Sequence, residues 1–182
     1  FWEYFMFIGR DGVPFEDRLK WYLKKTRDTQ PKWNKLSNGF EKVKKSLTSH
    51  SKQYFQDNIG MQVYFCKYSN QALLCTTRAV LSYIKDNSNS ENLLDCFLEI
   101  SEAKWELEKA LQTLINTEHG KWENFYRGDW LTDVRMTIRF VKTFQSITRI
   151  RGERHPYETW YRDVVESTKN SSMLGVQVSK KI

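Results

Sequence analysis

The chain has 182 residues, of which 40% are hydrophobic and 28% charged, and its formal net charge is +7. These proportions exclude a wholly disordered chain, and the length suffices for one domain with a real core. Only eight glycines and three prolines occur, too few for the many turns of a β-sandwich or barrel. The sequence therefore predicts an all-α fold, an antiparallel bundle of five or six helices around a long buried central helix.

The chain opens on an apolar stretch, FWEYFMFI, at residues 1–8. This stretch is too short for a transmembrane span and lacks the basic start of a signal peptide, so we expect no membrane span. Because the sequence begins inside an apolar run, we interpret residues 1–13 as a segment that leads out of a preceding domain. The helical bundle is then expected over residues 14–168, and residues 169–182 are expected to be a linker or the start of a following domain.

Two helices are predicted in the first third of the chain. Pro14 suits the first position of a helix that reaches about residue 27, and Pro31 is expected to end it. The next helix carries an apolar stripe at alternating spacings of three and four, typical of a helix that packs on one side only. The members of this stripe are Trp33, Leu36, Phe40, Val43 and Leu47.

Positive charge is concentrated in the same part of the chain. Between residues 11 and 52, eleven Lys and Arg residues stand against five Asp and Glu residues, a net charge of +6. Because the lysines alternate with apolar residues at helical spacing, a solvated helix face explains them more simply than a nucleic-acid site. Basic residues between aromatic rings can also bind single strands, so nucleic acid remains an alternative but unfavoured partner.

Residues 51–85 form the candidate central helix. From Asp57 to Ile84 the only charged residues are Asp57, Lys67 and Arg78. Apolar or small residues occupy nearly every face, which is typical of a buried helix. At 1.5 Å per residue this helix would be about 50 Å long. We interpret Asp57 as a capping or ion-pairing residue rather than as a general acid or base.

Two further helices and a short last one are predicted. Ser88 and Glu91 have the spacing of a capping box for a helix to about residue 117, which Gly120 is expected to end. Thr132 or Asp133 can cap a helix to about residue 151. Its inward residues are expected to be Val134, Ile138, Val141, Phe144 and Ile147. The last helix is expected from about residue 156 to about residue 167.

The residues that most often carry chemistry form no recognised motif. The cysteines, Cys66, Cys75 and Cys96, are odd in number and lack metal-ligand spacing, so we expect small core residues rather than a disulfide framework or a metal site. The histidines lie far apart, and no nucleophile elbow, P-loop or dinucleotide fingerprint occurs. We therefore assign no catalytic, cofactor-binding or metal-binding residue.

The loop between residues 119 and 133 gathers aromatic and charged side chains. Its candidate glycan or interface contacts are Trp122, Tyr126, Arg127, Asp129 and Trp130. Aromatic rings can stack on sugar faces while neighbouring polar groups bond hydroxyls. In the alternative interpretation, the aromatic residues are structural and hold the loop against the bundle.

Three stretches resemble a helical region of large bacterial carbohydrate-active enzymes. They are YFQDNIGMQV at residues 54–63, SNQALLCTTRAV at 69–80 and HGKWENFYRGD at 119–129. The nearest type is the glycoside hydrolase family 115 α-glucuronidases, and the resemblance covers about residues 50–130. It implies a bundle that follows a catalytic (β/α)₈ barrel and precedes a β-rich domain, so the catalytic carboxylates would belong to the barrel. It also implies packing against that barrel, shaping of the glycan cleft, a homodimer, and a periplasmic or extracellular location.

The leading hypothesis is a non-catalytic helical domain of a larger carbohydrate-active enzyme. Its expected partners are neighbouring domains of the same chain, with a polysaccharide as a candidate ligand and no cofactor. The alternative is a free-standing helical interaction module that binds a protein helix or nucleic acid through its lysine-rich helix. An independent enzyme built on the bundle is the third hypothesis.

Overall fold

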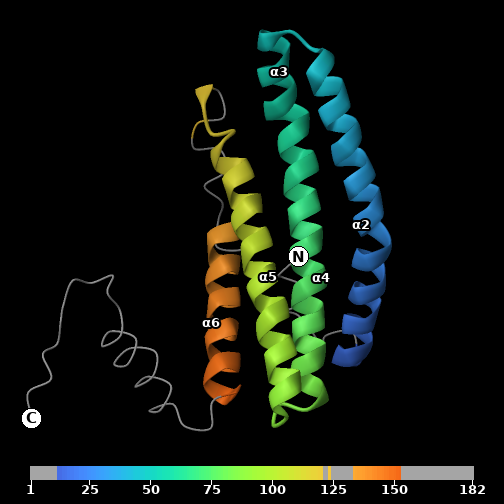
Figure 1. Cartoon of the computed structure of the whole chain (residues 1–182), viewed down its shortest axis with the longest axis vertical. Helices are drawn as coiled ribbons and strands as arrows, with labels where there is room; N and C mark the ends of the chain where they lie inside the picture. The colour runs from blue at the N-terminus through green and yellow to red at the C-terminus, as the bar shows by residue number, and fades with distance from the viewer. Residues whose placement is uncertain (1–11, 121–122, 124–132, 153–182) are drawn as a thin grey trace, which may run out of the picture.

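The structure is a computed structural model that describes residues 12–120, 123 and 133–152 (Figure 1). The regular elements in these ranges are all helical, which confirms the all-α class. Four are long: α2 (Phe15–Ser46), α4 (Met61–Lys85), α5 (Ser90–Ile115) and α6 (Val134–Gly152). A short helix, α3 (Ser49–Phe55), and a π-helical turn, η1 (Gln56–Gly60), lead into α4. The expected helix from residue 156 lies outside the described residues.

The four long helices lie side by side and alternate in direction (Figure 1). Extensive contacts join α2 to α4, α4 to α5 and α5 to α6. The described helices therefore form an open bundle, with α2 and α6 at its two edges. The predicted central helix corresponds to α3, η1 and α4 together, and α4 has a neighbour on each side. It shares the inner position with α5.

Helix α2 corrects the prediction that Pro31 ends the first helix, because the two helices expected before residue 48 are one. A proline inside a helix removes one backbone donor. Helix α4 places an amide beside this turn: Asn70 Nδ2 donates to Thr26 O (3.1 Å) and to Gln30 Oε1 (2.6 Å). Thr29 Oγ1 donates in return to Asn70 Oδ1 at 2.8 Å. Bonds from the neighbouring helix thus hold α2 at the point where local sequence predicts a break.

The apolar stripe predicted along α2 is only partly buried. Phe40 is 4% exposed, but Leu36 and Val43 are each 49% exposed. Ser37 is buried instead and accepts a hydrogen bond from Lys67 Nζ at 3.0 Å. The helix therefore turns small and polar residues toward α4, and the expectation that the whole stripe is packed was wrong.

The π turn η1 fits around the ring of Phe40. A Cβ atom on Gly60 would lie 2.6 Å from Phe40 Cζ. The Phe40 ring stacks on Phe55, with ring centroids 4.6 Å apart, and meets Tyr64 edge-on. The glycine therefore makes room for this ring between α2 and the start of α4.

The hydrophobic core lies between α4, α5 and α6. Its buried members are Ala72, Cys75, Ala79, Cys96, Ile100, Ala103, Leu107, Ile138 and Val141. Small side chains on α4 and α5 let these two helices approach closely. Cys75 and Cys96 behave as the predicted core residues, whereas Cys66 is only half-buried. Among the described residues, no helix combines the length and apolar character needed to cross a membrane.

The helix caps agree with the sequence at one end and differ at another. Asp133 Oδ1 accepts from the backbone N–H of Arg135 at 2.9 Å, as the prediction for α6 requires. At α5 the cap is Asn89, whose Oδ1 accepts from Glu91 N at 2.8 Å. The predicted cap, Ser88, instead donates its hydroxyl to Asp86. Helix α5 ends at residue 115, before Gly120, which has a φ of +55°.

Candidate functional site

The predicted contact residues of the loop lie outside the described residues. These are Trp122, Tyr126, Arg127, Asp129 and Trp130. What the structure describes is the start of this loop, where His119 Nε2 lies 3.3 Å from Asp57 Oδ2. Asp57 is buried in η1 and also accepts from Gln53 Nε2 at 2.8 Å. The contact is an ion pair when His119 is protonated, which is one of the two roles expected for Asp57, and it fixes the start of the loop to the π turn.

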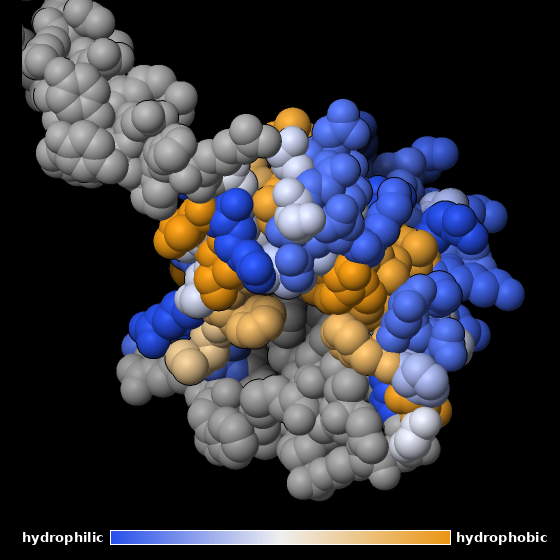
Figure 2. All heavy atoms as spheres, turned by 90° about the horizontal axis from the view of Figure 1, so that it is seen from below, coloured by the Kyte–Doolittle hydropathy of each residue, from blue (hydrophilic) through white to orange (hydrophobic). Residues whose placement is uncertain are grey.

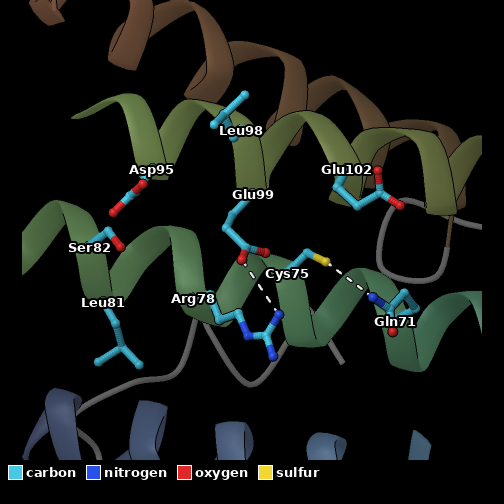
Figure 3. Close-up of a pocket in the computed structure, with 9 residues that line it drawn as sticks. All are labelled: Gln71, Cys75, Arg78, Leu81, Ser82, Asp95, Leu98, Glu99 and Glu102. Atoms are coloured by element: carbon cyan, nitrogen blue, oxygen red, sulfur yellow. Dashed lines mark hydrogen bonds and ion pairs between the residues drawn. The ribbon is translucent and has the colours of Figure 1, made fainter. Parts of the chain in front are cut away.

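A groove of about 650 Å³ runs between α4 and α5 (Figure 3). Its lining residues are Gln71, Cys75, Arg78, Leu81 and Ser82 of α4 and Asp95, Leu98, Glu99 and Glu102 of α5. Sequence reasoning missed this groove, because its residues come from two helices and form no local motif. The signal that could have pointed to it is the run of acidic residues on one side of α5.

The groove carries an excess of negative charge. Arg78 Nη1 and Glu99 Oε1 meet across it at 3.5 Å (Figure 3). Asp95 and Glu102 lie on either side of Glu99 along α5, and both are exposed. Three carboxylates against one guanidinium leave a net charge of −2 on the lining. The groove is thus suited to a cationic ligand rather than to an anionic one.

Apolar side chains border this polar row. Leu98 and Leu81 point away from each other on opposite sides of it (Figure 3). Leu98 belongs to an exposed apolar row on α5 in which Leu94 is 57%, Leu98 56% and Trp105 60% exposed. A ligand that covers the groove can therefore bury apolar surface as well as meet the carboxylates.

The Cys75 thiol, which lines the groove, has low reactivity. Cys75 is 1% exposed, and its Sγ accepts from Gln71 Nε2 at 3.5 Å. Burial, together with the carboxylate of Glu99, raises the pKa of the Cys75 thiol to about 12. Because the thiolate is the nucleophilic form, this cysteine is poorly suited to covalent catalysis at neutral pH. Its role here is to shape the groove.

A second surface lies on the outer side of α6. Ile138, Val141 and Thr148 are buried on the inner side, so the prediction that Ile147 points inward was wrong. The outer side is also apolar, with exposed fractions of 46% for Met136, 55% for Phe140, 44% for Ile147 and 59% for Ile150. In the view along the helix axes, exposed hydrophobic residues form a band across the molecule, and hydrophilic residues cover most of one side (Figure 2).

Within the described ranges, no group of three or more His, Cys, Asp or Glu side chains is placed to hold a metal ion. Comparison of the chain with models of protein families, with curated proteins and with solved structures finds no match. Two surfaces of the described residues are therefore the candidate functional sites, the acidic groove and the outer side of α6.

Proposed function

We propose that the chain is a non-catalytic helical docking domain whose α6 packs against a neighbouring protein surface. One observation carries this proposal: α6 is apolar on both sides, and among the described residues α5 and Tyr83 of α4 cover its inner side, while Met136, Ile147 and Ile150 on the outer side are 44% to 59% exposed. A helix that is apolar most of the way round is typical of a buried position. Within the described ranges, no second helix packs extensively against the outer side of this edge helix.

The exposed side chains supply the free energy for such an association. Complete burial of one large aliphatic or aromatic side chain is worth about 1.5–3 kcal/mol. The large side chains on the outer side of α6 are already about half buried, so covering each of them completely adds roughly half of that free energy toward the cost of association.

The charge of α6 indicates the character of the surface it would meet. The helix has five basic residues, Arg135, Arg139, Lys142, Arg149 and Arg151, and no acidic one. Lys142 already lies 3.5 Å from Glu108 of α5. We propose that the neighbouring surface is likewise apolar at its centre and acidic at its edge.

In this proposal the neighbour is another domain of the same polypeptide, in a larger carbohydrate-active enzyme. The support for that setting is the resemblance of residues 50–130 to the helical region of the family 115 glycoside hydrolases. The domain would act mechanically, by holding its neighbour in place, while the chemistry belongs to the other domain.

The test is a double variant, Ile147→Gln with Ile150→Gln. In the chain alone, we expect the free energy of unfolding to change by less than about 1 kcal/mol, because both side chains are about half exposed. Binding of a hydrophobic dye should fall. In the longer polypeptide, the same variant should increase hydrogen exchange across residues 134–152, because the proposed cover is lost.

The matched control is Val141→Ala on the inner side of the same helix. It should lower the free energy of unfolding of the chain alone, because Val141 is fully buried. Equal destabilisation by the outer double variant would show that the outer side belongs to the fold itself. Unchanged exchange in the longer polypeptide would show that nothing docks there.

A further inference from the structure

We infer that the groove between α4 and α5 binds a basic amphipathic helix of a separate protein. This helix would present Lys or Arg along its centre and apolar residues on both sides. The inference concerns a surface other than the outer side of α6, so it does not depend on the function proposed above. The length of the groove, its charge and the apolar residues that border it all favour such a helix.

The groove has the length and form of a helix-binding surface. Its α4 wall runs from Gln71 to Ser82, eleven steps along the helix. At 1.5 Å per residue this wall is about 16 Å long, which corresponds to three turns of a bound helix. Helices pack by placing the ridge of one in the groove of another, and the space between two neighbouring helices offers such a groove.

The charged residues of the groove determine which charge its partner must carry. Asp95 and Glu102 are exposed carboxylates, so a Lys or Arg side chain can reach either from solvent. The side chain of Glu99 is 30% exposed and already lies 3.5 Å from Arg78. The negative charge extends beyond the lining, because α5 as a whole has six acidic residues against two lysines, a net charge of −4. An acidic helix or a nucleic acid would be repelled by this surface.

The apolar border selects an amphipathic partner rather than a simply basic one. Leu98 stands on one side of the polar row and Leu81 on the other (Figure 3). Trp105, which is 60% exposed, lies two turns beyond Leu98 along α5. Tryptophan is enriched among the residues that carry most of the binding energy of an interface. A helix with apolar residues on both sides of its basic line would cover Leu81 and Leu98 together.

The test uses a defined peptide and its charge-reversed counterpart. The probe is a fluorescein-labelled peptide of about 18 residues, or five helical turns, with Lys along one line and Leu on both sides of it. Its binding to the whole chain is measured by fluorescence anisotropy. We expect the double variant Glu99→Gln with Glu102→Gln to raise the Kd about tenfold, because two charge contacts are lost. Raising the salt from about 50 to about 500 mM should likewise raise the Kd of the unaltered chain.

The matched control is Glu108→Gln, which also removes a carboxylate from α5 but lies outside the groove, beside Lys142. It should change the Kd by less than about twofold, since a distant exposed charge acts weakly through salt. Leu98→Ser tests the apolar border and should also weaken binding, while circular dichroism confirms that every variant is folded.

Three results would overturn the inference. One is equal weakening by Glu108→Gln and by the groove variant, which would mean a general charge effect. Another is equal binding of the counterpart peptide with Glu in place of Lys. The third is self-association of the chain that the groove variant abolishes, because the occupant would then be a second copy of this chain rather than a separate protein.

Discussion

Two helix–helix interfaces inside the molecule differ in their side-chain composition. Helices α4, α5 and α6 meet through aliphatic, alanine and cysteine side chains that are almost completely buried. Helix α2 meets α4 through the buried ring of Phe40 and through several polar contacts, among them the bonds of Asn70 to α2 and the bond from Tyr64 to Glu41. Buried apolar surface stabilises a fold in proportion to its area, whereas exchanging water for a protein hydrogen bond contributes about 1 kcal/mol.

The difference implies two levels of stability. The three-helix core should open only when the whole chain unfolds, while α2 should separate from α4 at a lower free energy. The two candidate docking surfaces, the groove and the outer side of α6, both belong to the core helices. Their geometry would thus persist even when α2 opens locally.

The largest predicted effect comes from a cavity in the core. Ile100 is fully buried, so Ile100→Ala should lower the free energy of unfolding by about 2–5 kcal/mol. Leu98→Ala on the same helix is the control, because Leu98 is 56% exposed. Urea denaturation measures both. A similar loss at the two positions would contradict the described orientation of α5.

The next effect tests the contact between α2 and the π turn. Gly60→Ala would place its Cβ 2.6 Å from Phe40 Cζ, and the ring is held between Phe55 and Tyr64. Because the ring must shift, we expect a loss of about 1–3 kcal/mol.

Gly39→Ala is the matched control for that substitution. A Cβ there meets nothing within 4 Å, and alanine favours a helix over glycine by about 1 kcal/mol. Opposite signs for the two glycines are therefore expected. A gain in stability from Gly60→Ala would mean that the ring moves freely at this interface.

A smaller effect should distinguish the polar interface from the core. Asn70→Ala removes the amide that bonds Thr26, Thr29 and Gln30 in the turn of α2 just before Pro31, and we expect a loss of about 1–2 kcal/mol. Hydrogen exchange should rise across α2 and stay unchanged in α5. Asn58→Ala is the control, because the Asn58 side chain donates to Tyr54 of its own helical segment. Faster exchange throughout α5 would show that α2 and the core open together.

Patterns within one helix predicted much of this fold. The nearly uncharged run before Ile84 identified the inner helix, and Asp133 marked the start of α6. The break at Pro31 was wrong, because the bonds that hold α2 there come from Asn70, forty residues away in the sequence. The cap of α5 was wrong by one residue, because Asn89 and Ser88 are both good caps and the turn decides between them.

The candidate surfaces were harder to predict than the fold. Glu99 and Arg78 come from different helices, so only their packing creates the groove. Ile147 was placed inward because it continues a helical spacing, yet Thr148 lies on the inner side. Periodicity shows that a helix has an apolar side, but it cannot tell which of two apolar sides is covered. Asp57 was recognised as a residue that would find a partner, although its partner could not be named from the sequence.

The smallest predicted effect concerns the contact of Asp57 with its partner, His119. This contact lies outside the two helix interfaces compared above. Asp57 Oδ2 and His119 Nε2 are 3.3 Å apart, and their contact joins η1 to the start of the loop that follows α5. The His119 side chain is 51% exposed. A double-mutant cycle of Asp57→Asn and His119→Gln should therefore give a coupling free energy of about 0.5–1 kcal/mol. Zero coupling would mean that the buried carboxylate relies on Gln53 alone.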